Sequence, residues 1–196
     1  MLSRVGIPEA QEHLSVADYL EGEERSEVRH EYIGGRVYGM SGGSEAHNTI
    51  SLNLAAAIRG HLRGKPCRAF VTGMKLRLRI AGEDIFYYPD VFVTCDPADD
   101  ESFYKTSPVL VIEVLSFSTE RLDRREKFLG YTGLSTLREY LLVEQERKRL
   151  TVFRKETGWK PEYHEGDAAV LRLESIGLEL PLSEVYEDVP IPDDRR

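Results

Sequence analysis

The feature that most constrains the fold is the run Val109–Leu115, seven residues that are apolar except for one glutamate. Such a run is typical of a strand covered on both faces of a sheet. Glu113 lies inside it, and an unpaired ionised carboxylate is costly to bury. We therefore expect Glu113 to be protonated, paired with a basic group, bound to a metal ion, or placed where the strand end reaches solvent.

A second acid stands in similar surroundings. Asp90 follows Pro89 and precedes the apolar residues 91–93. If the two strands are neighbours, the carboxylates converge, and like charges at short range favour a cation between them. Mg²⁺ binds one or two carboxylates together with water and substrate phosphate. The sequence therefore predicts Asp90 and Glu113 as metal ligands, and an ion pair with a basic residue is the alternative for each acid.

The remaining pattern predicts an α/β (α+β) chain, with a central mixed sheet flanked by helices and additional β-hairpins. Four apolar residues at four-residue spacing predict one helix, namely Ile50, Leu54, Ile58 and Leu62. Residues 75–80 alternate between basic and apolar, which indicates a strand with one wet face. A length of 196 residues favours a single domain, expected over 1–189, followed by a flexible Pro- and Asp-rich tail over 190–196.

Several classes of protein are disfavoured by the composition. No apolar run approaches the ~20 residues that cross a bilayer, and the N-terminal residues hold no apolar stretch of signal-peptide length. We therefore expect a cytoplasmic protein that does not bind membranes. Cys67 and Cys95 are the two cysteines. They give little support to a disulfide framework or a thiolate zinc site, which agrees with a reducing compartment.

The net charge of −8 by itself disfavours nucleic-acid binding. The distribution of the charges along the chain indicates otherwise. No acid occurs between Glu45 and Glu83, and basic residues accumulate there. Five of them are expected to contact the phosphate backbone of DNA, namely Arg59, Arg63, Lys75, Arg77 and Arg79. A solvated helix and hairpin is the alternative interpretation of the same residues.

Lys127 is the third candidate for the active site. A helix over 122–131 places Asp123, Lys127 and Tyr131 on one face. An ammonium beside a metal ion orients water or stabilises charge on a phosphate. An Asp–Lys pair at this spacing is also an ordinary feature of exposed helices. His47, at a helix start, either touches a phosphate or caps the helix, and capping is the commoner role.

Pro89-Asp90 followed by Glu113 in an apolar strand resembles the core of the PD-(D/E)XK nuclease superfamily. The segment from Val111 to Glu144 more narrowly resembles a bacterial family of restriction-endonuclease-like proteins, largely uncharacterised and expanded in cyanobacteria. The start Leu14-x-x-x-Asp-Tyr-Leu, the hairpin His-Glu-Tyr-Ile-x-Gly-x-Val and the pair His47-Asn48 fit the same family. The resemblance extends from about residue 14 to about residue 187.

The resemblance implies a restriction-endonuclease-like fold and a homodimeric endonuclease that uses Mg²⁺ or Mn²⁺ to hydrolyse double-stranded DNA. It assigns Asp90, Glu113 and Lys127 to catalysis and adds Glu31 to the metal ligands. A surface glutamate at the edge of the hairpin is the alternative for Glu31. The superfamily lysine is expected two residues after Glu113, where Leu115 stands. In this family the following helix supplies it, at Lys127. Because inactive relatives also lack the strand lysine, a catalytically silent nuclease-fold module that binds nucleic acid or oligomerises is the alternative.

Overall fold

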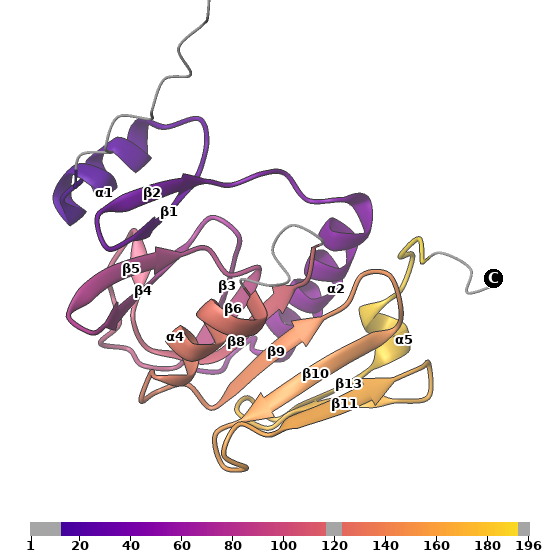
Figure 1. The fold of residues 1–196 in the computed structure, drawn as a ribbon. Helices are drawn as coiled ribbons and strands as arrows, with labels where there is room; N and C mark the ends of the chain where they lie inside the picture. The colour runs from indigo at the N-terminus through magenta and orange to yellow at the C-terminus, as the bar shows by residue number, and fades with distance from the viewer. Residues whose placement is uncertain (1–12, 117–122, 192–196) are drawn as a thin grey trace, which may run out of the picture.

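A computed structural model of the chain describes residues 13–116 and 123–191, and its strands form two larger sheets and one hairpin (Figure 1). The five-stranded sheet has the order β2 (Arg36–Gly39), β1 (His30–Ile33), β5 (Glu83–Tyr87), β4 (Lys75–Ile80) and β7 (Tyr104–Lys105). The six-stranded sheet has the order β11 (Pro161–Glu165), β10 (Arg149–Arg154), β9 (Glu139–Val143), β8 (Pro108–Val114), β6 (Val91–Thr94) and β3 (Arg68–Val71). The hairpin pairs β12 (Val170–Leu173) with β13 (Leu178–Pro181).

Helices cover both sheets. The first two are α1 (Val16–Arg25) and α2 (Glu45–His61), and shorter elements follow at η1 (Asp123–Lys127), α4 (Phe128–Thr132) and α5 (Leu182–Val185). The expected apolar stripe of α2 is buried, and it packs on one face of the six-stranded sheet. On the other face, α4 contacts both β9 and β4 and so lies between the two larger sheets.

The strand β8 confirms the prediction made from its sequence. Its residues alternate between the α2 side, which receives Leu110 and Ile112, and the opposite side, which receives Val111. It pairs antiparallel with β6 and parallel with β9. The mixed α+β class is therefore confirmed, although the strands divide between two larger sheets instead of joining one.

The cysteines depart from the expectation of unbridged thiols. Cys67 and Cys95 form a disulfide in the structure. The cause is the antiparallel register of β3 and β6, in which Arg68 pairs with Thr94 and the two cysteines flank that pair. Cysteine number and spacing carry no information on this register, so the sequence interpretation missed the bridge.

Two expected segments fall partly outside the described residues. Of the tail expected over 190–196, residues 192–196 lie outside them, and so does residue 122 of the helix expected over 122–131. The rest of that helix is observed as η1 followed by α4. Within the described residues, every helix is too short or too polar to cross a bilayer.

Candidate active site

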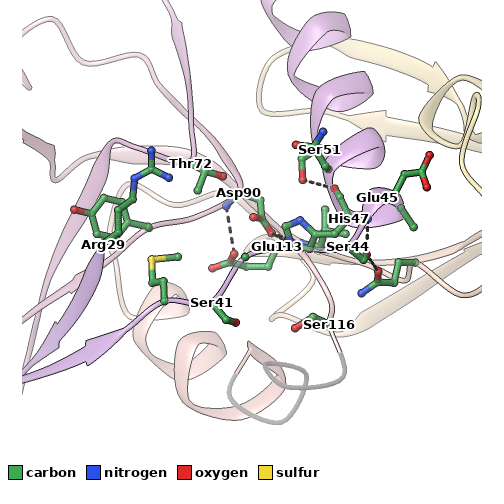
Figure 2. A pocket seen from close by; sticks show the side chains of 18 of the residues that line it. Arg29, Ser41, Ser44, Glu45, His47, Ser51, Thr72, Asp90, Glu113 and Ser116 are labelled. Carbon is green, nitrogen blue, oxygen red and sulfur yellow. Dashed lines mark hydrogen bonds and ion pairs between the residues drawn. The ribbon is translucent and has the colours of Figure 1, made fainter. Parts of the chain in front are cut away.

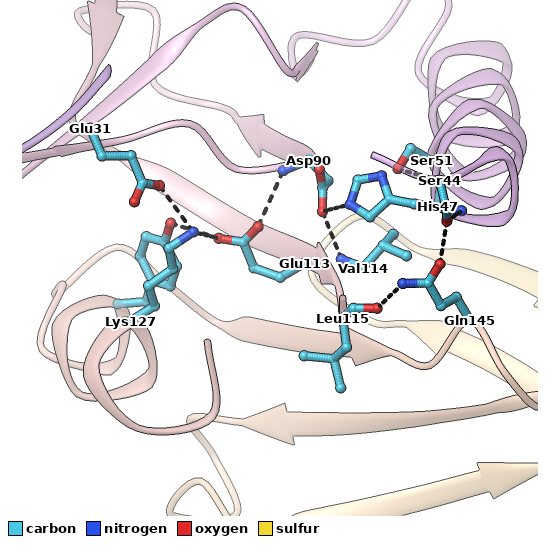
Figure 3. A network of polar contacts seen from close by, with 11 residues as sticks. Glu31, Ser44, His47, Ser51, Asp90, Glu113, Val114, Leu115, Lys127 and Gln145 are labelled. Carbon is cyan, nitrogen blue, oxygen red and sulfur yellow. Dashed lines mark hydrogen bonds and ion pairs between the residues drawn. The ribbon is translucent and has the colours of Figure 1, made fainter. Parts of the chain in front are cut away.

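Five polar side chains from distant parts of the chain form a continuous row of contacts (Figure 3). They come from β1, η1, β8, the residue before β6 and the first turn of α2. In order along the row they are Glu31, Lys127, Glu113, Asp90 and His47.

The register of two neighbouring strands brings the two central acids together. Val91 of β6 pairs with Ile112 of β8, so the preceding Asp90 comes opposite Glu113. The backbone N–H of Asp90 lies 3.4 Å from Oε2 of Glu113, and that of Val114 donates to Oδ2 of Asp90 at 2.8 Å. Both acids are buried, with exposed fractions of 8% for Asp90 and 3% for Glu113. The convergence inferred from the apolar strands is therefore present in the structure.

Lys127 joins this pair from the end of η1. Its Nζ lies 3.3 Å from Oε1 of Glu113 and 3.0 Å from Oε1 of Glu31. Its exposed fraction is 5%, which excludes the interpretation as an ordinary lysine on an exposed helix. Tyr87 lies beneath the ammonium, with 5.2 Å from Nζ to the ring centroid. The lysine is thus held between two carboxylates and an aromatic ring.

Tyr131 completes the surroundings of Glu113. It lies four residues after Lys127, and its hydroxyl donates to Oε1 of Glu113 at 3.0 Å. Burial, and then the negative charge of Glu113, raise the pKa of Tyr131 well above its ordinary value. Burial likewise raises the pKa of Tyr87 to about 12. Both phenols therefore stay protonated at neutral pH, and Tyr131 acts as a fixed donor that helps to hold the carboxylate.

His47 stands at the other end of the row. Its Nε2 lies 3.2 Å from Oδ2 of Asp90. The capping role that sequence reasoning favoured for it belongs to Ser44, whose Oγ accepts from the backbone N–H of His47 at 3.1 Å. The imidazole contacts Asp90 instead of capping the helix. The signal in the sequence was a histidine near the start of a helix, where it is the third helical residue.

A side-chain relay ties the same helix start to β8, and sequence reasoning gave no sign of it. The hydroxyl of Ser44 contacts the side-chain carbonyl of Gln145, in the turn that follows β9. The amide nitrogen of Gln145 donates to the backbone carbonyl of Leu115 at 2.7 Å. This relay fixes α2 relative to the strand that carries Glu113.

A cavity of about 1430 Å³ opens beside the row (Figure 2). Its lining includes Asp90, Glu113, Lys127 and His47, and also the polar loop 41–44 that leads into α2. The volume exceeds that of sites for small molecules, which lie at about 300–1,000 Å³. Asp90 and Glu113 therefore face a space that can hold a large polar ligand.

The donor set of the row suits a hard divalent cation. Within the described ranges, no group of three or more His, Cys, Asp or Glu side chains is arranged to hold a metal ion. Two adjacent carboxylates at a cavity nevertheless match Mg²⁺, which leaves other positions to water and substrate phosphate. Glu31, expected among the ligands, is placed beyond Lys127, where it contacts the ammonium instead of the acid pair.

The five basic residues expected at DNA do not share one environment. Arg59 of α2, Arg63 in the turn after α2, and Arg79 of β4 are exposed. Arg77 is half-buried, and its Nη2 lies 2.9 Å from Oδ1 of Asp84. Lys75 departs from the expectation most clearly, since its exposed fraction is 6%.

Lys75 is buried because it begins β4 underneath other elements. Its Nζ lies 3.4 Å from the hydroxyl of Tyr88. Burial lowers the pKa of this lysine, and nearby Glu23 opposes the shift. The alternation of residues 75–80 predicted one wet basic face, but the packing of neighbouring elements covers its first residue. Lys75 is therefore not accessible to a phosphate backbone in this structure.

Relatives of the chain were found among protein families and curated proteins. The model of the Uma2 family, described as "Putative restriction endonuclease", matches residues 16–183. An uncharacterized protein of Synechocystis sp. is 38% identical over 177 residues, which covers 88% of this chain and 91% of that protein. A second one from the same organism is 33% identical over 145 residues, which covers 72% of this chain and 81% of that protein.

The fold has a counterpart among solved structures. A crystal structure described as "a putative nuclease belonging to DUF820", from Anabaena variabilis, is similar with a TM-score of 0.65 and 16% sequence identity. The similarity covers 82% of this chain and 91% of that one. It confirms the fold class, and the cyanobacterial relatives agree with the family resemblance found in the sequence. Because the family model spans most of its length, the chain belongs to the Uma2 family.

Proposed function

We propose that the protein is a metal-dependent endonuclease that hydrolyses phosphodiester bonds of DNA. The observation that carries the proposal is the convergence of Asp90 and Glu113 at the cavity, with the ammonium of Lys127 next to them. The family description and the nuclease-like structural neighbour support the same class of reaction. The strand lysine of the superfamily is replaced by Leu115, and Lys127 brings a positive charge to Glu113 from the following helix.

Four residues of the row have a role in this proposal. Asp90 and Glu113 hold Mg²⁺ or Mn²⁺ through their carboxylates. The cation, when bound, lowers the pKa of its water and offsets negative charge on the phosphate. Lys127 orients the attacking water or stabilises charge on the phosphate, and Glu31 keeps the ammonium in place.

The substrate and assembly are further parts of the proposal. Double-stranded DNA is the proposed substrate, contacted through its backbone by exposed arginines, among them Arg59, Arg63 and Arg79. Arg77 is half-buried and is proposed to contribute a further backbone contact. A homodimer would place two sites on the two strands of a duplex. A cytoplasmic location is the last part of the proposal.

The proposal is tested by nicking of supercoiled plasmid DNA in Mg²⁺ and, separately, in Mn²⁺. The wild-type protein should nick the plasmid, and chelation with EDTA should stop it. Asp90→Asn and Glu113→Gln keep the side-chain shapes but remove the charges, so both should lower the rate by about 10³-fold or more. Glu165→Gln is the matched control, because Glu165 is an exposed strand carboxylate outside the cavity lining.

Two results would overturn the proposal. Equal nicking by the wild type and Asp90→Asn would show that the activity belongs to a contaminant. Salt-dependent DNA binding by the wild type without cleavage in either metal would favour the catalytically silent nuclease-fold module instead.

A further inference from the structure

We propose that His47 is a positioning residue that holds the carboxylate of Asp90 so that Oδ1, and not Oδ2, is presented to the metal ion. The inference rests on the proposed function, because it concerns the same acid pair. It adds a residue and a defined task that the carboxylates and the lysine do not account for.

The first observation is the crowding of one carboxylate oxygen. Oδ2 of Asp90 accepts from the backbone N–H of Val114 at 2.8 Å and lies 3.2 Å from Nε2 of His47 (Figure 3). An ionised carboxylate only accepts hydrogen bonds, so the facing Nε2 is the atom that carries the hydrogen. Within the described residues, no hydrogen bond reaches Oδ1 of Asp90. The carboxylate is thus anchored by one oxygen and offers the other.

The second observation is that His47 approaches Asp90 from its own direction. Figure 3 shows Glu113 on one side of Asp90 and the imidazole on the other. The donors to Oδ2 belong to two different elements, the strand β8 and the helix α2. Rotation of the carboxylate would therefore break both contacts at once. A ligand held in this way loses little freedom when it binds a cation, which is the usual role of groups that orient metal ligands.

The third observation is that the backbone of His47 is held in place. The backbone of His47 is held by Ser44 at its N–H and by Ser51, whose hydroxyl donates to its carbonyl at 2.8 Å. The helix that carries it has 17 residues and buries its apolar stripe in the core. The relay from Ser44 through Gln145 to Leu115 fixes this helix start to β8. The backbone that carries the imidazole is therefore tied to the strand that carries Glu113.

Gly43 supplies an independent sign that the ring position is built into the chain. A Cβ atom at this glycine would lie 2.9 Å from Nδ1 and 3.1 Å from Cγ of His47. The backbone of Gly43 is not in the left-handed region, so conformational freedom does not account for the glycine. The glycine is accounted for by the space that the imidazole occupies. An alanine here must displace the ring, which makes Gly43→Ala a second way to disturb the contact with Asp90.

The test is calorimetric titration of the full chain with Mn²⁺, together with the electron paramagnetic resonance spectrum of the bound ion. His47→Ala should raise the Kd for Mn²⁺ by about 10- to 100-fold, the usual loss when an orienting group is removed. His47→Gln should restore most of the affinity, because its amide nitrogen has the same reach as Nε2. His47→Asn, whose nitrogen matches Nδ1 instead, should behave like His47→Ala.

Two further variants guard against a loss of folding. Gly43→Ala retains the histidine and should also weaken Mn²⁺ binding and alter the spectrum. His61→Ala is the matched control, since this histidine lies on the same helix but contacts the carbonyl of Ile176 at 2.9 Å. Its Kd for Mn²⁺ should equal that of the wild type. Thermal unfolding of each variant shows that the comparison is made between folded proteins.

The outcomes separate the inference from the function on which it rests. A wild-type protein that binds no Mn²⁺ would overturn the proposed function. If the wild type binds Mn²⁺ and His47→Ala binds it with the same Kd, the inference alone is overturned. Failure of His47→Gln to recover affinity would also overturn it. That result would indicate an imidazole that ligates the ion directly, because an amide donor cannot replace such a ligand.

Discussion

Two clusters of buried charge lie at opposite ends of the same pair of parallel strands. Glu113 is near the end of β8, where it pairs with Leu142, and Glu139 begins β9, where it pairs with Leu110. Their exposed fractions are similarly small, 3% for Glu113 and 1% for Glu139. Burial by itself therefore does not distinguish the two acids.

Their positions relative to the cavity do. Oε1 of Glu139 accepts from Nε of Arg154 at 3.1 Å and from the backbone N–H of Glu174 at 3.1 Å. Oε2 accepts from the backbone N–H of Ser175 at 2.8 Å. Both oxygens of Glu139 thus have protein partners, as do both oxygens of Glu113. The difference is that Glu139 is absent from the cavity lining, whereas Glu113 and Asp90 line it. The comparison teaches that a buried acid marks a site when it faces a cavity and a second acid, at the carboxyl end of the strand.

The largest effect on stability is expected at the Glu139 end. Arg154→Met removes the cation that accompanies a fully buried carboxylate, and breaking such a pair costs about 3–5 kcal/mol. The free energy of unfolding, measured by urea denaturation, should fall by about that amount. The Kd for Mn²⁺ of the folded variant should stay at the wild-type value. A large change in Mn²⁺ affinity would show that the two clusters are coupled.

A smaller, opposite effect is expected at the cavity end. Mn²⁺ at about 100 times its Kd should raise the free energy of unfolding by about 2.7 kcal/mol, because it binds the folded chain alone. The gain should vanish in Asp90→Asn and persist in Arg154→Met. Thermal unfolding with and without Mn²⁺ measures both. A gain that survives in Asp90→Asn would place the cation elsewhere.

Tyr131→Phe should have a moderate effect within the cavity row. It removes the hydrogen bond to Glu113, and a bond to a charged group contributes about 1.5–3 kcal/mol, part of which Lys127 compensates. We expect a loss of about 1 kcal/mol in unfolding free energy and weaker Mn²⁺ binding. Tyr163→Phe, at an exposed tyrosine, is the control and should change neither quantity.

The smallest effect is a difference in alkaline stability between the wild type and Tyr131→Phe. Burial and Glu113 raise the pKa of Tyr131 in the folded protein, whereas a tyrosine in the unfolded chain ionises near pH 10. The unfolded chain therefore loses the proton first, and stability present below pH 10 is lost as the pH rises. At pH 10.5 one such tyrosine costs about 0.8 kcal/mol.

Denaturation across this range should consequently show a shallower decline in Tyr131→Phe than in the wild type. Equal slopes would mean that Tyr131 ionises at its ordinary pKa in the folded state. Below pH 9 the two proteins should differ by a constant amount, since neither state ionises there.

The sequence predicted much of the candidate site because local pattern carries that information. An apolar strand with one acid, and a second acid before another apolar strand, were sufficient to place Glu113 and Asp90 together. The helical spacing of Lys127 and Tyr131 likewise predicted one shared face. These inferences depend on residues close in sequence and on one assumption, that the two strands are neighbours.

The features that sequence reasoning missed depend on contacts between distant segments. The burial of Lys75, the Cys67–Cys95 bridge and the approach of His47 to Asp90 are each set by how separate elements pack. Alternation along a strand gives the faces of that strand, but not what covers each face. The division of the strands between two sheets was not predicted for the same reason.

The ion pair between Glu31 and Lys127 makes the row of contacts depend on the folding of both sheets. Glu31 belongs to the five-stranded sheet, and Glu113, also bound to Lys127, belongs to the six-stranded sheet. The row is therefore incomplete until both sheets have formed and residue 127 has joined them. A chain in which only one of the two sheets has formed lacks this arrangement, so the proposed cleavage requires both sheets.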